Sequence, residues 1–88
     1  MKKSELVDYF RSMKPDELKE FRTTYLELSQ RGMAKELFTN LDSVLRWEAR
    51  NPKRHSAPHT IVAYWAIERF SEQLERYYTD KQVAEAAV

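Results

Sequence analysis

The chain has 88 residues and a mass of 10.5 kDa, with 15 Lys and Arg against 14 Asp and Glu, one glycine, three prolines and no cysteine. This is the length of one small domain, which has little room for a large pre-formed active-site cavity. The lack of cysteine excludes disulfides, thiol nucleophiles and thiolate metal sites. A net charge of +1 argues against a nucleic-acid-binding protein that is basic over its whole surface.

The composition predicts an all-α fold. Ala, Glu, Lys, Leu and Arg make up almost half of the residues, and a single glycine leaves few tight turns for β-hairpins. We expect a compact bundle of four helices plus a short C-terminal helix, in a single domain over residues 1–88. The longest apolar run, Ile61–Ile67, is too short for a membrane span or a secretory signal, so we expect a cytoplasmic protein.

The first half of the chain contains signals for two helices. Ser4 is placed to cap a first helix that ends near Met13. Pro15 suits the first position of a second helix, and it also disfavours helical backbone in the residue before it. The second helix is predicted over about residues 15–31, with Gly32 as its terminator.

The second half contains a longer pattern, interrupted by one loop. Apolar spacing predicts a third helix over about residues 33–50, which the Thr39-Asn40 pair could divide. Two prolines and a lack of large apolar side chains mark residues 51–59 as the principal loop. A fourth helix is predicted over about 58–79 and a short final one over 81–87.

Residues 79–87 read Thr-Asp-Lys-Gln-Val-Ala-Glu-Ala-Ala. This segment resembles the first helix of a bacterial helix-turn-helix, in which a second helix reads the DNA. The resemblance covers about a tenth of the chain and does not extend to that second helix. We therefore assign no family to the chain as a whole.

A basic and aromatic segment is the main candidate for partner binding. If Leu41 is the centre of the buried face of the third helix, Trp47 lies about 120° away, on a polar face. An indole between guanidinium groups suits base stacking with phosphate contacts, and it equally suits a protein-binding hot spot. The near-zero net charge favours a protein. Alternatively, Trp47 is covered by the following loop or by the first helix, and the arginines are ordinary solvated charges. The candidate residues are Arg46, Trp47, Arg50, Lys53 and Arg54.

Metal binding and catalysis have weak signals. His55 and His59 have the four-residue spacing of helical metal ligands, but Pro58 interrupts the helix, and no acidic residue lies between Glu48 and Glu68 to complete a site. There is no Gly-x-Ser-x-Gly motif and no glycine-rich phosphate loop. We expect no metal, no cofactor and no enzymatic activity.

Large apolar side chains exceed what one apolar stripe per helix needs. The run Ile61–Ile67 is apolar around its whole circumference, which predicts either a helix enclosed on every side or a face for another protein. The second possibility predicts self-association, as a homodimer or larger. The residues expected to contact the other copy are Ile61, Tyr64, Trp65, Tyr77 and Tyr78.

Together these observations predict a non-enzymatic helical binding module that acts by protein–protein contact. An adaptor or an inhibitor of a larger partner fits this size, and we expect it to self-associate without contacting a membrane. The alternative is a nucleic-acid-binding protein that uses the basic and aromatic residues of 46–54.

Overall fold

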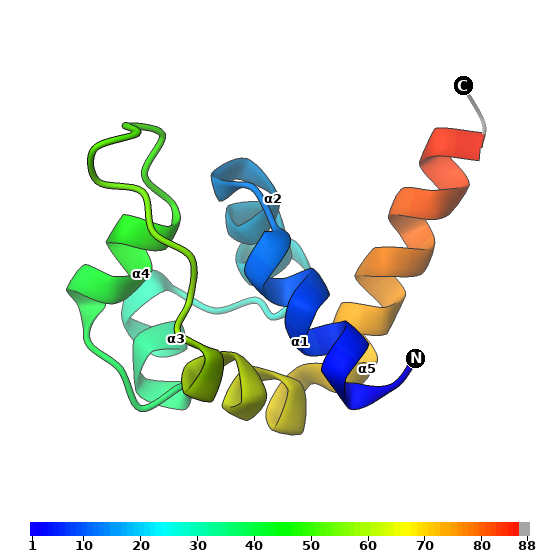
Figure 1. The fold of residues 1–88 in the computed structure, drawn as a ribbon, viewed down its shortest axis with the longest axis horizontal. Helices are drawn as coiled ribbons and strands as arrows, with labels where there is room; N and C mark the ends of the chain where they lie inside the picture. Colours follow the sequence, from blue (N-terminus) through cyan, green and yellow to red (C-terminus); the bar gives the residue numbers. More distant parts are fainter. Residues whose placement is uncertain (87–88) are drawn as a thin grey trace.

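The computed structural model describes residues 1–86, and it confirms the all-α prediction (Figure 1). No strand occurs in the part of the chain that is described. No helix in that part is both long and apolar enough to cross a membrane. The helical segments, in chain order, are α1 (Lys3–Ser12), α2 (Pro15–Glu20), the π-helical segment η1 (Phe21–Tyr25), α3 (Gln30–Glu36), α4 (Leu41–Trp47) and α5 (Thr60–Ala86).

Pro15 separates α1 from α2, as predicted. Lys14 has extended backbone with ψ of 159°, because the proline ring disfavours helical backbone in the preceding residue. The carboxylate of Glu17 accepts the Lys14 N–H at 2.9 Å and completes the start of α2. The predicted capping of α1 by Ser4 is wrong, since α1 begins one residue earlier and Lys2 precedes it without a side-chain cap.

The predicted helix over residues 15–31 divides into shorter pieces. In η1 the Leu26 N–H donates to the Phe21 carbonyl at 3.0 Å, the wider hydrogen bonding of a π-helix. The chain then turns at Glu27, whose φ is 53°. Gly32 does not terminate a helix. It lies inside α3, where its N–H donates to the capping Ser29 hydroxyl at 2.9 Å.

The predicted helix over residues 33–50 also divides, at the position that the sequence suggested. The side-chain oxygen of Asn40 accepts the Ser43 N–H at 2.9 Å and caps α4. Because α3 and α4 are separate helices, an apolar stripe drawn through both of them does not describe either one. This division decides where Trp47 lies.

Helix α5 joins two segments that were predicted as separate helices, over 58–79 and 81–87. It runs from Thr60 to Ala86 and is interrupted by a bend at Phe70, whose backbone is not helical, with φ of −130°. Figure 1 shows the first half of α5 along the lower edge of the molecule and the second half rising toward the C-terminal end. The segment that resembles a helix-turn-helix is the last part of this helix, and Ala87 lies outside the described residues.

The core is one cluster of buried side chains that draws on every helix. Helix α1 packs against α5, and α3 packs against α4. Some of the apolar residues that the sequence left in excess are used here, including Met33, Trp47 and Tyr77. The buried members are Leu6, Val7, Phe10, Met13, Leu18, Phe21, Met33, Ala34, Leu37, Val44, Trp47, Ala63, Ala66, Ile67, Leu74 and Tyr77.

Tyr77 and Tyr78 pack within their own chain. Tyr77 is fully buried, with its ring 5.7 Å from that of Phe21, and this burial raises its pKa well above the usual range. The prediction that Tyr77 contacts another copy is therefore wrong. Tyr78 is half-buried, and its ring meets Tyr9 edge to face at 5.0 Å. Nearby, the Tyr25 hydroxyl donates to Asp80, which raises the pKa of Tyr25 to about 12.

A buried ion pair ties η1 to the end of α4. The Arg22 guanidinium donates to both carboxylate oxygens of Glu48, at 2.6 and 3.0 Å. The Arg22 and Glu48 side chains are only 7% and 4% exposed. Arg22 also donates to the Leu28 carbonyl at 2.9 Å, and Gln30 donates to Glu48 at 3.4 Å. These bonds compensate for the removal of two charges from water.

Arg22→Met is expected to lower the free energy of unfolding by about 3–5 kcal/mol, because it leaves the Glu48 carboxylate buried without its partner. Arg50→Met is the matched control. It removes the same charge from an exposed pair with Asp16 and should cost at most about 1 kcal/mol. Urea denaturation measures both variants, and the double variant Arg22→Met/Glu48→Met should recover most of the loss. Equal losses for the two single variants would contradict this assignment.

Candidate functional site

The basic residues of the predicted partner site lie on α4 and on the loop that follows it. Arg46, Lys53 and Arg54 are all exposed. Asn51 shapes the loop, since its side-chain oxygen accepts the Lys53 N–H at 3.0 Å and its carbonyl accepts the Arg54 N–H at 2.9 Å. The loop therefore presents these cations from a defined turn.

Trp47 does not belong to this surface, and the prediction that it lies on a polar face is wrong. Its side chain is in the core, with the residue only 4% exposed. The buried face of α4 contains Val44 and Trp47, whereas Leu45 is 42% exposed. The wheel was centred on Leu41 because one apolar stripe was drawn through residues 33–50, and this stripe crosses the break between α3 and α4.

Arg50 is already paired. Its guanidinium contacts the Asp16 carboxylate at 2.7 and 2.9 Å, across from the start of α2. By contrast, Arg46, Lys53 and Arg54 form no ion pair within residues 1–86. Of the basic residues predicted to bind a partner, these three remain available.

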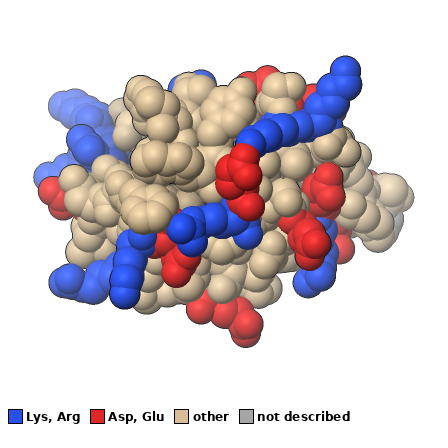
Figure 2. Space-filling model, turned by 90° about the horizontal axis from the view of Figure 1, so that it is seen from below, with Lys and Arg blue, Asp and Glu red and all other residues tan. Residues whose placement is uncertain are grey.

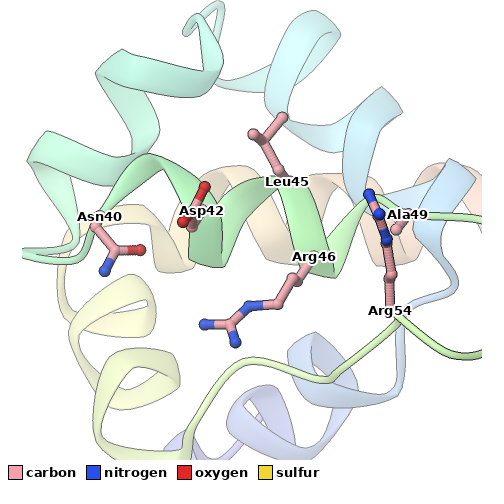
Figure 3. A pocket seen from close by; sticks show the side chains of 6 residues that line it. All are labelled: Asn40, Asp42, Leu45, Arg46, Ala49 and Arg54. Atoms are coloured by element: carbon pink, nitrogen blue, oxygen red, sulfur yellow. The ribbon is translucent and has the colours of Figure 1, made fainter.

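A shallow pocket of about 420 Å³ lies beside them. Figure 3 shows that the Arg46 side chain extends from α4 and the Arg54 side chain from the loop after it, in different directions. They do not converge on one point, and a carboxylate, Asp42, shares the wall. The pocket is therefore poorly suited to clamping a single small anion. Its lining residues are Asn40, Asp42, Leu45, Arg46, Ala49 and Arg54.

His55 and His59 are both exposed, in the loop before α5. The His59 ring nitrogen Nδ1 accepts the Ile61 N–H at 3.3 Å, which assists the start of α5. Within residues 1–86, no group of three or more His, Cys, Asp or Glu side chains is arranged to hold a metal ion.

A second candidate surface lies on the first half of α5 and the turn between α3 and α4. Phe38 is 66% exposed and Ile61 is 56% exposed, while Tyr64 and Trp65 are each 40% exposed. The Phe38 ring meets the Trp65 ring edge to face at 5.3 Å, so the two segments form one area. We call these four residues the aromatic surface. Figure 2 views this side of the molecule and shows uncharged side chains gathered on it with charged groups beside them.

Of the two alternatives for the run Ile61–Ile67, the helix enclosed on every side is wrong. Ala63, Ala66 and Ile67 face the core, but Ile61, Tyr64 and Trp65 face water. The reason is that α5 lies at the edge of the molecule, where only one of its faces meets other helices (Figure 1). The three exposed residues are those predicted for self-association in this segment.

Phe38 has a backbone conformation that phenylalanine rarely adopts. It follows the end of α3 with φ of 53°. The Thr39 N–H donates to the Ala34 carbonyl at 2.9 Å and the Phe38 N–H to the Lys35 carbonyl at 3.3 Å. These two bonds form a Schellman motif, in which the left-handed position usually holds glycine. A Cβ at this position costs about 1 kcal/mol.

Two cations lie over the rings of the aromatic surface. The Arg69 guanidinium lies 5.0 Å from the centre of the Phe38 ring and pairs with Glu36 at 2.8 Å. Lys3 lies 5.7 Å from the centre of the Tyr64 ring and pairs with Glu68. Each cation is attracted to the face of a ring and is neutralised by a carboxylate. The border of the surface is therefore charged but close to neutral.

Phe38 was missed from the sequence, because its spacing fits the apolar stripe of the predicted third helix. The adjacent Thr39-Asn40 pair was the one available signal, since a helix that ends there exposes the residue before it.

The chain gives no match to a family model, to a curated protein or to a solved structure.

Trp47→Ala is expected to lower the free energy of unfolding by about 3–5 kcal/mol, because it opens a cavity in the core. Leu45→Ala, two residues away on the exposed side of α4, should change it by about 0.5 kcal/mol or less. Thermal and urea unfolding measure both variants. A small loss of unfolding free energy for Trp47→Ala would contradict the burial of this residue in the core.

Phe38→Gly is expected to be more stable than Phe38→Ala by about 1 kcal/mol, since only glycine relieves the left-handed backbone. The control is Lys35, an exposed residue inside α3, where the alanine variant should be the more stable one by a similar amount. Urea denaturation of the four variants tests this reversal. The same order of stability for the glycine and alanine variants at both positions would contradict the strained backbone at Phe38.

Proposed function

We propose that this chain is a non-enzymatic helical binding module that acts by protein–protein contact, with the aromatic surface as its principal site. The observation that carries the proposal is the group of exposed large side chains, Phe38, Ile61, Tyr64 and Trp65, on one face. Aromatic residues are enriched in the buried cores of protein interfaces. Trp and Tyr are also the most frequent hot-spot residues.

The backbone of Phe38 supports the same proposal. A strained conformation lowers stability, and here it holds a large apolar ring that is still 66% exposed to water, so the fold gains little burial in return. Strain of this kind clusters at functional sites, where binding a partner repays it. An adaptor, or an inhibitor that covers part of a larger partner, suits a module of this size.

Nucleic-acid binding is the second candidate, and one observation favours it. Lys53 and Arg54 lie in the stretch without acidic residues between Glu48 and Glu68, and neither they nor Arg46 form an ion pair within residues 1–86. Two observations count against it. The buried Trp47 offers no stacking platform for a base, and Arg50 is neutralised by Asp16. The protein-binding proposal therefore has the stronger support.

A photo-crosslinking amino acid, p-benzoylphenylalanine, tests the proposal when placed at Trp65 in cells of the native source. The matched control carries it at Val83, a more exposed position on the far half of α5. We expect a defined protein adduct from position 65 only, formed by this chain itself or by another protein. Trp65→Ala should then weaken binding of the purified partner by about 30-fold or more. The absence of a protein adduct specific to position 65 would contradict the proposal.

Fluorescence anisotropy with labelled random-sequence duplex DNA and single-stranded RNA tests the second candidate. Protein binding at the aromatic surface predicts no appreciable affinity for either probe. Affinity that falls steeply between 50 and 200 mM salt, by roughly a factor of 10 for every two phosphate contacts, would favour nucleic acid. In that case Arg46→Ala and Arg54→Ala should each reduce the salt dependence, while Trp65→Ala should not.

A further inference from the structure

We infer that the partner at the aromatic surface is a second copy of this chain, with the first half of α5 packed antiparallel to its own copy about a two-fold axis near Tyr64 and Trp65. This inference rests on the proposed function. Its first support is the spacing of the exposed residues on α5. Ile61, Tyr64, Trp65 and Glu68 are three, four and seven residues apart, which places them in one stripe along the helix.

The size of the surface fits the centre of such a contact. A fully exposed aromatic residue has about 200 Å² of surface, so Phe38, Tyr64 and Trp65 together expose about 300 Å². A stable interface buries roughly 800 Å² on each partner, with an apolar centre and a polar border. The rings supply the centre, and the ion pairs around them supply part of the border.

The charges favour a copy of this chain over a strongly charged partner. At the border, the cation Lys3 pairs with the carboxylate of Glu68 and the cation Arg69 pairs with that of Glu36. A highly acidic or highly basic partner would meet like charges somewhere on this border. A two-fold axis can bring each charge opposite one of the other sign, and a net charge of +1 gives little overall repulsion between copies.

The antiparallel direction follows from Glu68 and from the start of α5. Glu68 belongs to the exposed stripe and lies on the same side of the bend at Phe70 as Tyr64 and Trp65. Parallel packing would place the Glu68 carboxylates of the two copies side by side. Antiparallel packing separates them by about 10 Å along the helix, at 1.5 Å per residue from the axis. It also brings Glu68 near the first turn of the other α5, which contains no acidic residue to offset the partial positive charge of its free amides.

The oligomeric state is the first measurement. Sedimentation equilibrium over micromolar concentrations should show a monomer–dimer equilibrium for the natural sequence. Trp65→Ala and Phe38→Gly should each raise the dimer dissociation constant, Trp65→Ala by 30-fold or more. Val83→Ala, which removes an exposed apolar side chain beyond the bend of α5, should leave it unchanged. A dimer that is insensitive to Trp65→Ala would overturn the inference.

The chain has no cysteine, so single-cysteine variants report the direction of packing. Under mild oxidation with copper phenanthroline, Tyr64→Cys should form a disulfide-linked dimer rapidly. Glu72→Cys and the control Val83→Cys should form one only at the rate of random collision. Rapid linkage through position 72 would indicate parallel packing and contradict the proposed arrangement.

The two proposals can fail separately. A chain that stays monomeric throughout, but still forms a protein adduct from position 65, would overturn the second copy as partner and leave the binding module intact. A monomer with no such adduct would overturn both. A dimer linked through position 64 and disrupted by Trp65→Ala supports both.

Discussion

The Arg22–Glu48 ion pair is the constraint on which the arrangement of the short helices depends. It joins residues 26 positions apart, and it can form only if both charges leave water together. Arg22 also holds the Leu28 carbonyl, at the turn that leads into α3, and Glu48 follows directly after α4. The pair therefore fixes both ends of the α3–α4 unit against η1. The turn that carries Phe38 is positioned as a result.

Both candidate surfaces arise where this small fold leaves one side of a helix without a neighbour. The first half of α5 forms an edge of the molecule, so its outer face is free, and the strained turn at Phe38 adds a ring to it. The exposed side of α4 carries Arg46 and the following loop carries Arg54, beside a pocket with a carboxylate in its wall. The aromatic surface has contiguous rings and a border close to neutral. The basic residues of α4 and its loop have no aromatic residue beside them on the surface, because Trp47 is buried in the core. The aromatic surface is therefore well suited to protein contact, whereas the basic residues are less well suited to nucleic-acid contact.

Local chemistry was sufficient to predict some of these features and insufficient for others. Pro15 predicted a helix boundary because it disfavours helical backbone at Lys14. The two prolines of residues 51–59 likewise predicted the loop before α5. Trp47 was misplaced because a helical wheel is valid only within one continuous helix. Gly32 was misread because the capping hydroxyl of Ser29 competes with the usual role of glycine at a helix end. The left-handed position of Phe38 had no signal in residue type, and the Arg22–Glu48 pair depends on tertiary packing.

The π-helical segment gives this chain an unusual response to a change in length. Thr23 and Thr24 are both exposed, so side-chain replacements there meet few neighbours. Deleting either residue would convert the wide turn of η1 into an ordinary α-helical one. Leu26 would then stand four residues after Phe21 and could keep its hydrogen bond to the Phe21 carbonyl, so the residues that follow would keep nearly the same rotation about the helix axis. The same short stretch thus tolerates both new side chains and the loss of one residue, whereas a deletion inside α4 would rotate the residues after it by about 100° and displace Glu48.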